Sequence, residues 1–424
     1  MTGAPPFTVE VDHNAYLHDG ASRVDAIVTV TGSEDAAPAP GGLEIIIIDC
    51  SSSMTGEKIR SARRATVAAI AALRDGVSFT VIAGTQIAEQ IYPRKGTTAT
   101  ADSDTRAEAT KTVDRLRAYG GTGIGTWLTL ARRTAQRHPA GIKHAVLLTD
   151  GQNGESAGEL TAAIQACIGK FTCDCRGVGT DWRVDELRTI SSALLGTVDI
   201  VAKATDLADD FRAIMNAAMD KRVADVALRL WTPRDAQVRF VKQVSPTVED
   251  LTARRTETGA LLGDYPLGSW GVESREYHVS VEVPRRSVGE RMLAGRISLV
   301  RAGSDEILGK GLIQVEWTGD SALSTQINVR VAHYTGQAEL AEVIRDGLTA
   351  LEAGDEPLAT ARLGRAVTLA DESGNDATAR LLNRVVEVID TATGTVRLRR
   401  NVSKEDVMTI DSRSTKTVPV RRGP

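Results

Sequence analysis

Four consecutive isoleucines, Ile45–Ile48, constrain the fold more than any other feature of this sequence. A strand without polar alternation is buried on both faces, as at the centre of a parallel sheet. The run ends at Asp49-Cys50-Ser51-Ser52-Ser53, and residues 57–73 then have helical spacing. Open α/β sheets bind ligands at the carboxyl ends of their strands. The carboxylate and hydroxyls of this loop therefore predict an oxygen site for a hard cation.

Two further loops in the same region of alternating strands and helices carry side chains with oxygen atoms. Gly120-Gly121-Thr122-Gly123 precedes a predicted helix at residues 124–137, and Asp150 follows an apolar strand at residues 144–149. Together with the D-x-S-x-S pattern of residues 49–53, they complete a set that resembles the metal-ion-dependent adhesion site of von Willebrand factor A domains. Thr122 and Asp150 match the family's positions residue by residue, and the resemblance covers roughly residues 43 to 220.

The resemblance implies a doubly wound, mostly parallel sheet with the metal loops at its crest, and a site for Mg²⁺ or Mn²⁺. Ser51 and Ser53 would coordinate directly, and Thr122 either directly or through water. Asp49 and Asp150 would supply negative charge, partly through bound water. One coordination position then stays open for the Asp or Glu of a protein partner, because an anionic oxygen gains more from the cation than water does. The predicted function is non-enzymatic, metal-dependent capture of that partner.

Other chemistries have weaker support in the sequence. The Ser-rich loop could simply cap the next helix through Ser53 or Thr55. A phosphatase-like enzyme could use Asp49 as its nucleophile, but it would favour a second acid where this chain has Ser51. The sequence has no G-x-x-x-x-G-K-[ST] run, and its six histidines are scattered. We therefore predict that the chain has no catalytic residues.

Composition limits the compartment and the partners. A chain of 424 residues is long enough for two or three domains, and its net charge of -4 disfavours a general nucleic-acid or membrane surface. The N-terminus lacks the pattern of a signal peptide, and no window is apolar enough to span a membrane, so we expect a cytoplasmic protein. The four cysteines do not suggest a disulfide framework, and Cys173 and Cys175 are predicted to be buried free thiols.

The order of patterns along the chain predicts five segments. Strands with alternating polarity come first, and a region of alternating strands and helices follows. Next come strands separated by turn residues, then amphipathic helices, and finally a basic polar stretch. The predicted segments are 1–40 (strands that join a β-sandwich), 41–221 (the von Willebrand-like domain), 222–330 (the antiparallel sandwich), 331–393 (a three-helix cap) and 394–424 (a mobile tail). Leu262-Gly263-Asp264 with Leu267-Gly268 resembles the sandwich of cytosolic bacterial, actinobacterial-like members of the family.

Two resemblances suggest further partners. In the tail, Thr415 and Thr417 each have a valine three residues later, which resembles the phosphothreonine ligands of forkhead-associated domains. Phosphorylation of either threonine is therefore a hypothesis, and a solvated tail without function is its alternative. Proteins of this build also resemble partners of MoxR-type AAA+ ATPases and of metal chelatases. A regulatory subunit of such an assembly is the alternative to an independent interaction module.

Overall fold

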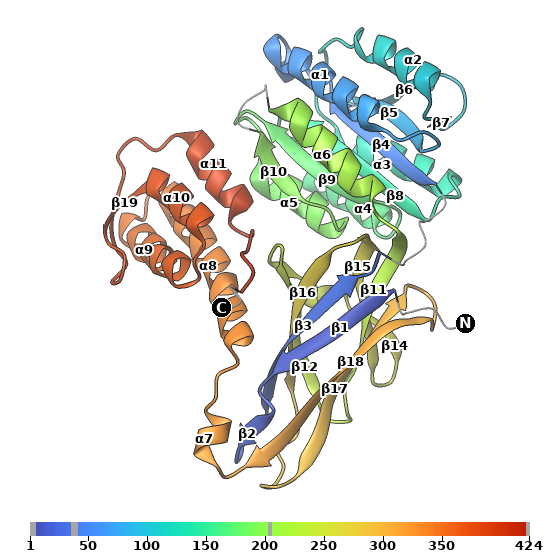
Figure 1. Cartoon of the computed structure of the whole chain (residues 1–424). Coiled ribbons are helices and arrows are strands. Elements are labelled where there is room, and N and C mark those ends of the chain that lie inside the picture. The colour runs from blue at the N-terminus through green and yellow to red at the C-terminus, as the bar shows by residue number, and fades with distance from the viewer. Residues whose placement is uncertain (1–5, 35–40, 202–205, 421–424) are drawn as a thin grey trace. The chain divides into compact units, whose positions relative to one another are not determined.

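The structure is a computed structural model that describes residues 6–34, 41–201 and 206–420. The chain forms two compact units, Pro38–Ala224 and Met1–Ala37 with Asp225–Pro424 (Figure 1). Among the described residues, no helix combines the length and the apolar character that crossing a membrane requires.

The unit Pro38–Ala224 is built on a seven-stranded sheet in the order β10-β9-β8-β4-β5-β6, with β7 paired to β5. The five strands from β10 to β5 are parallel, whereas β6 and β7 are antiparallel to β5. This confirms the predicted mostly parallel α/β fold. The strands are β4 (Gly42–Asp49), β5 (Ser78–Gly84), β6 (Ala88–Tyr92), β7 (Ala99–Thr100), β8 (Ile142–Thr149), β9 (Thr172–Val178) and β10 (Val198–Val201). The helices are η1 (Ser52–Met54), α1 (Glu57–Ala72), α2 (Ser103–Val113), α3 (Ile124–Arg137), α4 (Ala157–Cys167), α5 (Val184–Ala193) and α6 (Leu207–Met219).

Strand β4 lies at the centre of the sheet, and its isoleucine run explains why. All four isoleucines are fully buried. Ile46 and Ile48 belong to a core cluster that also contains Ala62 of α1 and Phe211 of α6. Alternate side chains of a strand point to opposite faces, so a strand covered by helices on both sides needs an uninterrupted apolar run. The four cysteines, Cys173 and Cys175 among them, are buried and free, as predicted.

Helix α2 is shorter than the sequence predicted. The spacing of Ala109, Val113 and Leu116 predicts a helix over residues 105–119, but α2 ends at Val113. The backbone then turns, and the Tyr119 N–H donates to the carbonyl of Cys50 at 2.7 Å instead of to its own helix. This long-range bond directs residues 114–119 toward the loop after β4.

The second unit contains two large, mostly antiparallel sheets. One has the order β1-β3-β16-β12-β13, and the other β14-β15-β11-β17-β18-β2, in which β2 is parallel to β18. The N-terminal strands β1 and β3 pair with each other, and β3 also pairs with β16. Gly309 and Gly311 of β18 face Val9 and Val11 of β1, where an added Cβ would come within 3 Å of a valine methyl group. The strands are β1 (Phe7–His13), β2 (Tyr16–His18), β3 (Arg23–Gly32), β11 (Val223–Trp231), β12 (Gln237–Ser245), β13 (Glu249–Asp250), β14 (Thr256–Gly259), β15 (Leu262–Trp270), β16 (Ser274–Glu282), β17 (Arg291–Arg301) and β18 (Ile307–Thr318), and a short helix η2 (Thr252–Arg254) follows β13.

Helices return after the sheets, but the third ends earlier than predicted. A short turn α7 (Ser321–Ser324) precedes α8 (Val329–Glu352), α9 (Glu356–Glu372) and α10 (Asp376–Val385). The sequence predicted helix up to residue 391, whereas residues 386–390 form strand β19 (Val386–Asp390), which pairs with β20 (Thr395–Leu398). Valines alternate at Val386 and Val388, and β-branched residues favour a strand where a partner strand is present.

The prediction that residues 394–424 form a mobile tail is wrong for the part that the structure describes. After β20 comes helix α11 (Lys404–Arg413). Its N-cap is Ser403, whose hydroxyl accepts from the Asp406 N–H at 3.0 Å. Ile410 of α11 is fully buried in the core cluster of α8, α9 and α10. A few well-spaced apolar residues therefore anchor a stretch whose overall composition is polar and basic. Residues 421–424 lie outside the described residues.

The segment after α11 lies against β12 and α8. The Thr417 hydroxyl donates to the carbonyl of Val244 at 2.7 Å, and its N–H donates to the carbonyl of Pro246 at 3.0 Å. Gln337 of α8 makes two hydrogen bonds to the backbone of Val418, of 2.6 and 2.8 Å. Phosphorylation of Thr417 would require this segment to detach first, because the hydroxyl already serves as a donor inside the fold. The forkhead-associated partner remains a prediction.

A negative charge at Thr417 is expected to release this segment. Thr417→Glu removes the donor to Val244 and brings a carboxylate against backbone carbonyls, which costs about 1–3 kcal/mol of local stability. Thr415→Glu is the matched control, because the Thr415 side chain makes no hydrogen bond within the described chain. Hydrogen exchange at the Val418 amide should accelerate at least ~10-fold in the first variant and much less in the second. Equal acceleration in both variants would mean that the Thr417 hydrogen bond does not hold the segment.

Candidate metal centre

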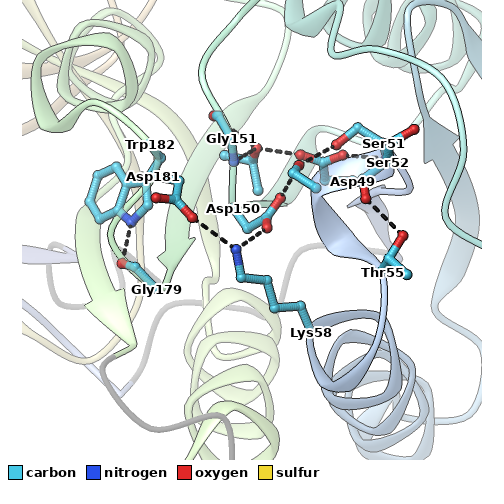
Figure 2. Close-up of polar contacts among 12 residues, drawn as sticks. Asp49, Ser51, Ser52, Thr55, Lys58, Asp150, Gly151, Gly179, Asp181 and Trp182 are labelled. Atoms are coloured by element: carbon cyan, nitrogen blue, oxygen red, sulfur yellow. Dashed lines mark hydrogen bonds and ion pairs between the residues drawn. The ribbon is translucent and has the colours of Figure 1, made fainter.

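Asp49, the last residue of β4, forms the floor of the predicted site. Its Oδ1 accepts from the Ser51 N–H at 2.7 Å, and its Oδ2 accepts from the Thr149 hydroxyl at 2.5 Å (Figure 2). The first bond shapes the loop after β4, and the second joins β4 to β8. Asp49 and Asp150 are fully buried. Both predicted carboxylate ligands are therefore buried inside the fold and do not lie on an exposed loop rim.

The two serines link the carboxylates of neighbouring strands. Ser51 Oγ lies 2.9 Å from Ser53 Oγ, and the Ser53 hydroxyl donates to Asp150 Oδ1 at 2.7 Å. Ser51 is 2% exposed, whereas Ser53 is exposed. Residues almost a hundred positions apart in the sequence thus place their oxygens side by side, with Ser53 on the solvent side.

Thr122 reaches the same point from the third loop. A Cβ added to Gly151 would lie 3.2 Å from Ser53 Oγ and 3.5 Å from Thr122 Oγ1, so both hydroxyls face the same backbone position. Because any side chain at Gly151 would crowd these oxygens, the absence of a Cβ keeps the space between the loops open. The structure therefore brings together all five predicted residues, Asp49, Ser51, Ser53, Thr122 and Asp150.

Backbone hydrogen bonds fix the three loops to one another. The Ser52 N–H donates to the carbonyl of Gly120 at 3.0 Å, and the Gly154 N–H donates to that of Thr122 at 2.8 Å. Glu155 accepts from the Gly125 N–H at 2.6 Å, at the first turn of α3. Unpaired N–H groups at a helix start favour such a carboxylate. Hydrogen bonds within the fold thus fix the loops that carry the oxygen cluster.

Lys58 of α1 adds a positive charge that the sequence pattern did not predict. Its ammonium donates to Asp150 Oδ2 at 2.6 Å and to Asp181 Oδ2 at 3.1 Å (Figure 2). Burial lowers the pKa of Lys58, but the hydrogen bonds and charges of the two aspartates outweigh it, and the net shift is upward. Lys58 is therefore cationic at neutral pH and balances part of the charge of Asp150.

The pKa of Asp49 is raised. Burial is the main cause, the charge of Asp150 adds to it, and the hydrogen bonds from Ser51 and Thr149 oppose it. Two carboxylates held near one another away from water destabilise each other, and a cation between them relieves that cost. Among the described residues, Lys58 is the cation that contacts this pair of carboxylates, and it contacts Asp150 rather than Asp49.

The donor set fits a hard divalent cation. The described residues contain no group of three or more His, Cys, Asp or Glu side chains that could hold a metal ion. The cluster instead combines two carboxylates with three hydroxyls, and such oxygen ligands suit Mg²⁺ and Mn²⁺ rather than softer metals. Asp49, Ser51, Ser53, Thr122 and Asp150 are the residues that would hold the ion.

Sequence reasoning missed Lys58 and Thr149. Thr149 carries the one hydroxyl at the end of an apolar strand and directly precedes Asp150. Its place in the sequence could therefore have indicated a role in the site. Lys58 gave no comparable signal, because its contact with Asp150 spans 92 positions of the chain. Only the fold brings the start of α1 to the end of β8.

The sheet topology and the oxygen cluster at its carboxyl edge define the class: an α/β domain that presents its site on the loops after the central strands. The family profile of the von Willebrand factor type A domain matches residues 44–200, and that of the von Willebrand factor type A C-terminal domain matches residues 368–414. A solved structure, von Willebrand factor type A from Catenulispora acidiphila, is 48% identical, covers 99% of each chain and has a TM-score of 0.94. The chain belongs to the von Willebrand factor type A family.

More distant structures share the fold alone. The ArnB paralog VWA2 from Sulfolobus acidocaldarius is 11% identical, with a TM-score of 0.60 over 97% of this chain and 98% of its own. The human COPII-coat protein Sec24c is 10% identical, with a TM-score of 0.55 over 92% of this chain and 60% of its own. No curated protein matches the chain. Von Willebrand factor type A domains are generally modules for protein interaction.

Proposed function

We propose that this protein binds Mg²⁺ or Mn²⁺ at Asp49, Ser51, Ser53, Thr122 and Asp150 and uses the bound ion to capture an acidic side chain of a protein partner. The observation that carries the proposal is the unbroken sequence of contacts from Asp49 through Ser51 and Ser53 to Asp150, with steps of 2.7–2.9 Å. Bound there, the cation supplies a Lewis-acidic position for an anionic oxygen.

Charge and exposure favour binding rather than catalysis. The two ligand carboxylates, Asp181 and Lys58 carry a formal net charge of about -2, which a divalent ion neutralises, so the carboxylate of a partner meets no net negative charge at the site. The hydroxyls of Ser51, Ser53 and Thr122 lie beside carboxylates and one another, and no histidine or lysine base among the described residues donates to them or accepts from them. Ser53 is exposed, so a partner's carboxylate can approach from the solvent side.

Ser53→Ala is the variant that best tests partner capture. Ser53 is exposed, and its loss removes one donor oxygen without opening a cavity in the core. We expect the immobilised wild-type chain to retain partners from its native cell in Mg²⁺ and release them in EDTA, with recovery at least ~10-fold lower for Ser53→Ala. Ser52→Ala is the matched control, because Ser52 is also exposed and lies in the same loop but outside the proposed ligand set.

Three outcomes distinguish the alternatives. Partners retained equally in EDTA would contradict metal-dependent capture. A ring ATPase as the single metal-dependent partner would favour the regulatory-subunit alternative. Release of phosphate from a generic ester, lost in Asp49→Asn, would favour a phosphatase-like enzyme.

A further inference from the structure

A groove of about 690 Å³ lies next to the candidate metal centre. One wall consists of the residues that follow Ser53 and the first turns of α1, and the other of the segment after α2. The residues that line it are Thr55, Gly56, Ile59, Arg63, Asp114, Arg115, Arg117 and Ala118.

Three arginines that have no carboxylate partner within the described part of the chain dominate this groove, which we call the arginine groove. Arg115 and Arg117 are exposed, and Arg63 is half-buried, with its Nε buried and without a hydrogen-bond acceptor among the described residues. Arg60 and Arg64, the neighbours of Arg63 on α1, both pair with Glu57 at 2.8 Å. A buried donor without an acceptor costs free energy, so the unpaired Arg63 marks a position where an anionic ligand would be stabilised.

The groove is continuous with the loops of the metal centre. The hydroxyl of Thr55 donates to the carbonyl of Ser52 at 2.7 Å. On the opposite wall, Ala118 directly precedes Tyr119, whose N–H donates to the carbonyl of Cys50 at 2.7 Å. Both walls are therefore anchored to the loop that carries Ser51 and Ser53. The lining of the groove begins at Thr55, two residues after the proposed ligand Ser53.

We infer that the arginine groove binds the acidic residues next to the metal-binding Asp or Glu of the partner, so that the partner presents an extended acidic segment. This inference rests on the proposed function. It further specifies that the partner residues next to the captured carboxylate are acidic. Three arginines and Asp114 give the groove a formal net charge of about +2, complementary to such a segment. Arginine pairs with carboxylates through two parallel hydrogen bonds, which favours fixed contacts. Three arginines against one aspartate favour an anionic side chain over a neutral one, and the phosphoserine probe below distinguishes a phosphate from a carboxylate.

Labelled peptides in a glycine–serine frame test both sites separately. The probes are one peptide with an Asp followed by Glu residues, one with the Asp alone, and one in which phosphoserine replaces a Glu. Affinity is measured by fluorescence anisotropy on the full chain in Mg²⁺ and in EDTA. The groove variant is Arg63→Gln/Arg115→Gln/Arg117→Gln. Its matched control is Arg94→Gln/Arg133→Gln/Arg137→Gln, which changes the net charge equally at exposed arginines outside the groove.

We expect the groove variant to bind the Asp–Glu peptide at least ~10-fold more weakly, and the control to bind it almost as well as the wild-type chain. Thermal unfolding of both variants confirms that they are folded. If EDTA abolishes binding but the groove variant binds normally, the groove inference is wrong and the proposed function stands. If the peptide affinity is the same in EDTA as in Mg²⁺ but falls in the groove variant, the proposed function is wrong. The absence of binding by any acidic peptide overturns both, and a clear preference for the phosphoserine peptide overturns the choice of an acidic segment.

Discussion

Saturating Mg²⁺ is expected to raise the unfolding temperature of the Pro38–Ala224 unit in the full chain, and Asp49→Asn and Asp150→Asn are expected to abolish the effect. A ligand that binds only the folded state at about 100 times its dissociation constant adds about 2.7 kcal/mol of stability. In a unit of this size that corresponds to ~5–10 °C. The buried carboxylate of Asp49 supplies the reason, because burial and the charge of Asp150 disfavour its ionised form and a bound cation offsets that cost.

The comparison of asparagine with alanine at residue 49 separates the two roles of this residue. An asparagine side chain would keep an oxygen to accept from the Ser51 N–H or the Thr149 hydroxyl, whereas alanine would leave both donors without an acceptor. We therefore expect Asp49→Ala to lose about 1–3 kcal/mol even in EDTA, and Asp49→Asn much less. The burial of Asp49 and its two hydrogen bonds are the reason for this expected loss.

Calorimetry in matched Mg²⁺ and EDTA buffers checks both expectations. Asp181→Asn is the control, because Asp181 contacts Lys58 but is 66% exposed and is not a proposed ligand. The control should keep the full Mg²⁺ response. An equal Mg²⁺ response in the wild-type chain and in both ligand variants would reveal a general salt effect and would contradict a bound ion at this site.

Local patterns were enough to predict the fold class and the positions of the candidate ligands. The isoleucine run before Asp49 can be buried only in a central strand, and each ligand follows a strand or precedes a helix within a few residues. The contacts of Lys58 and Thr417 could not be predicted, because each joins segments more than 90 positions apart. The arginine groove could not be predicted either, because one of its walls is the segment after α2, which a long-range bond from Tyr119 to Cys50 joins to the loop after β4.

The second large effect is expected in the seven-stranded sheet, at the end opposite the candidate metal centre, where His144 contacts two carboxylates. His144 Nδ1 lies 2.7 Å from Glu44 Oε2, and Nε2 lies 3.0 Å from Asp174 Oδ2. Glu44 is 1% exposed. His144→Leu would leave this carboxylate buried without a cation, which costs about 3–5 kcal/mol. The double variant Glu44→Leu/His144→Leu should recover much of that loss, since Asp174 still accepts from the Thr197 N–H at 2.7 Å and has Arg176 nearby.

The pH dependence of unfolding distinguishes an ion pair from simple packing at His144. Burial lowers the pKa of His144, but Glu44 and Asp174 outweigh it and raise the pKa to about 10, from an ordinary value of 6.5. A raised folded pKa contributes stability that is fully present below pH 6.5 and is lost as the pH rises toward 10. For Asp174, burial alone would raise the pKa, but His144 and Arg176 hold it well below 3.8, so its contribution is present above that pH and is lost in acid. Urea unfolding should therefore show the largest difference between the wild-type chain and His144→Leu near pH 6, and a much smaller one near pH 10. A difference that is constant over this range would show that the imidazole acts by filling space and carries no charge.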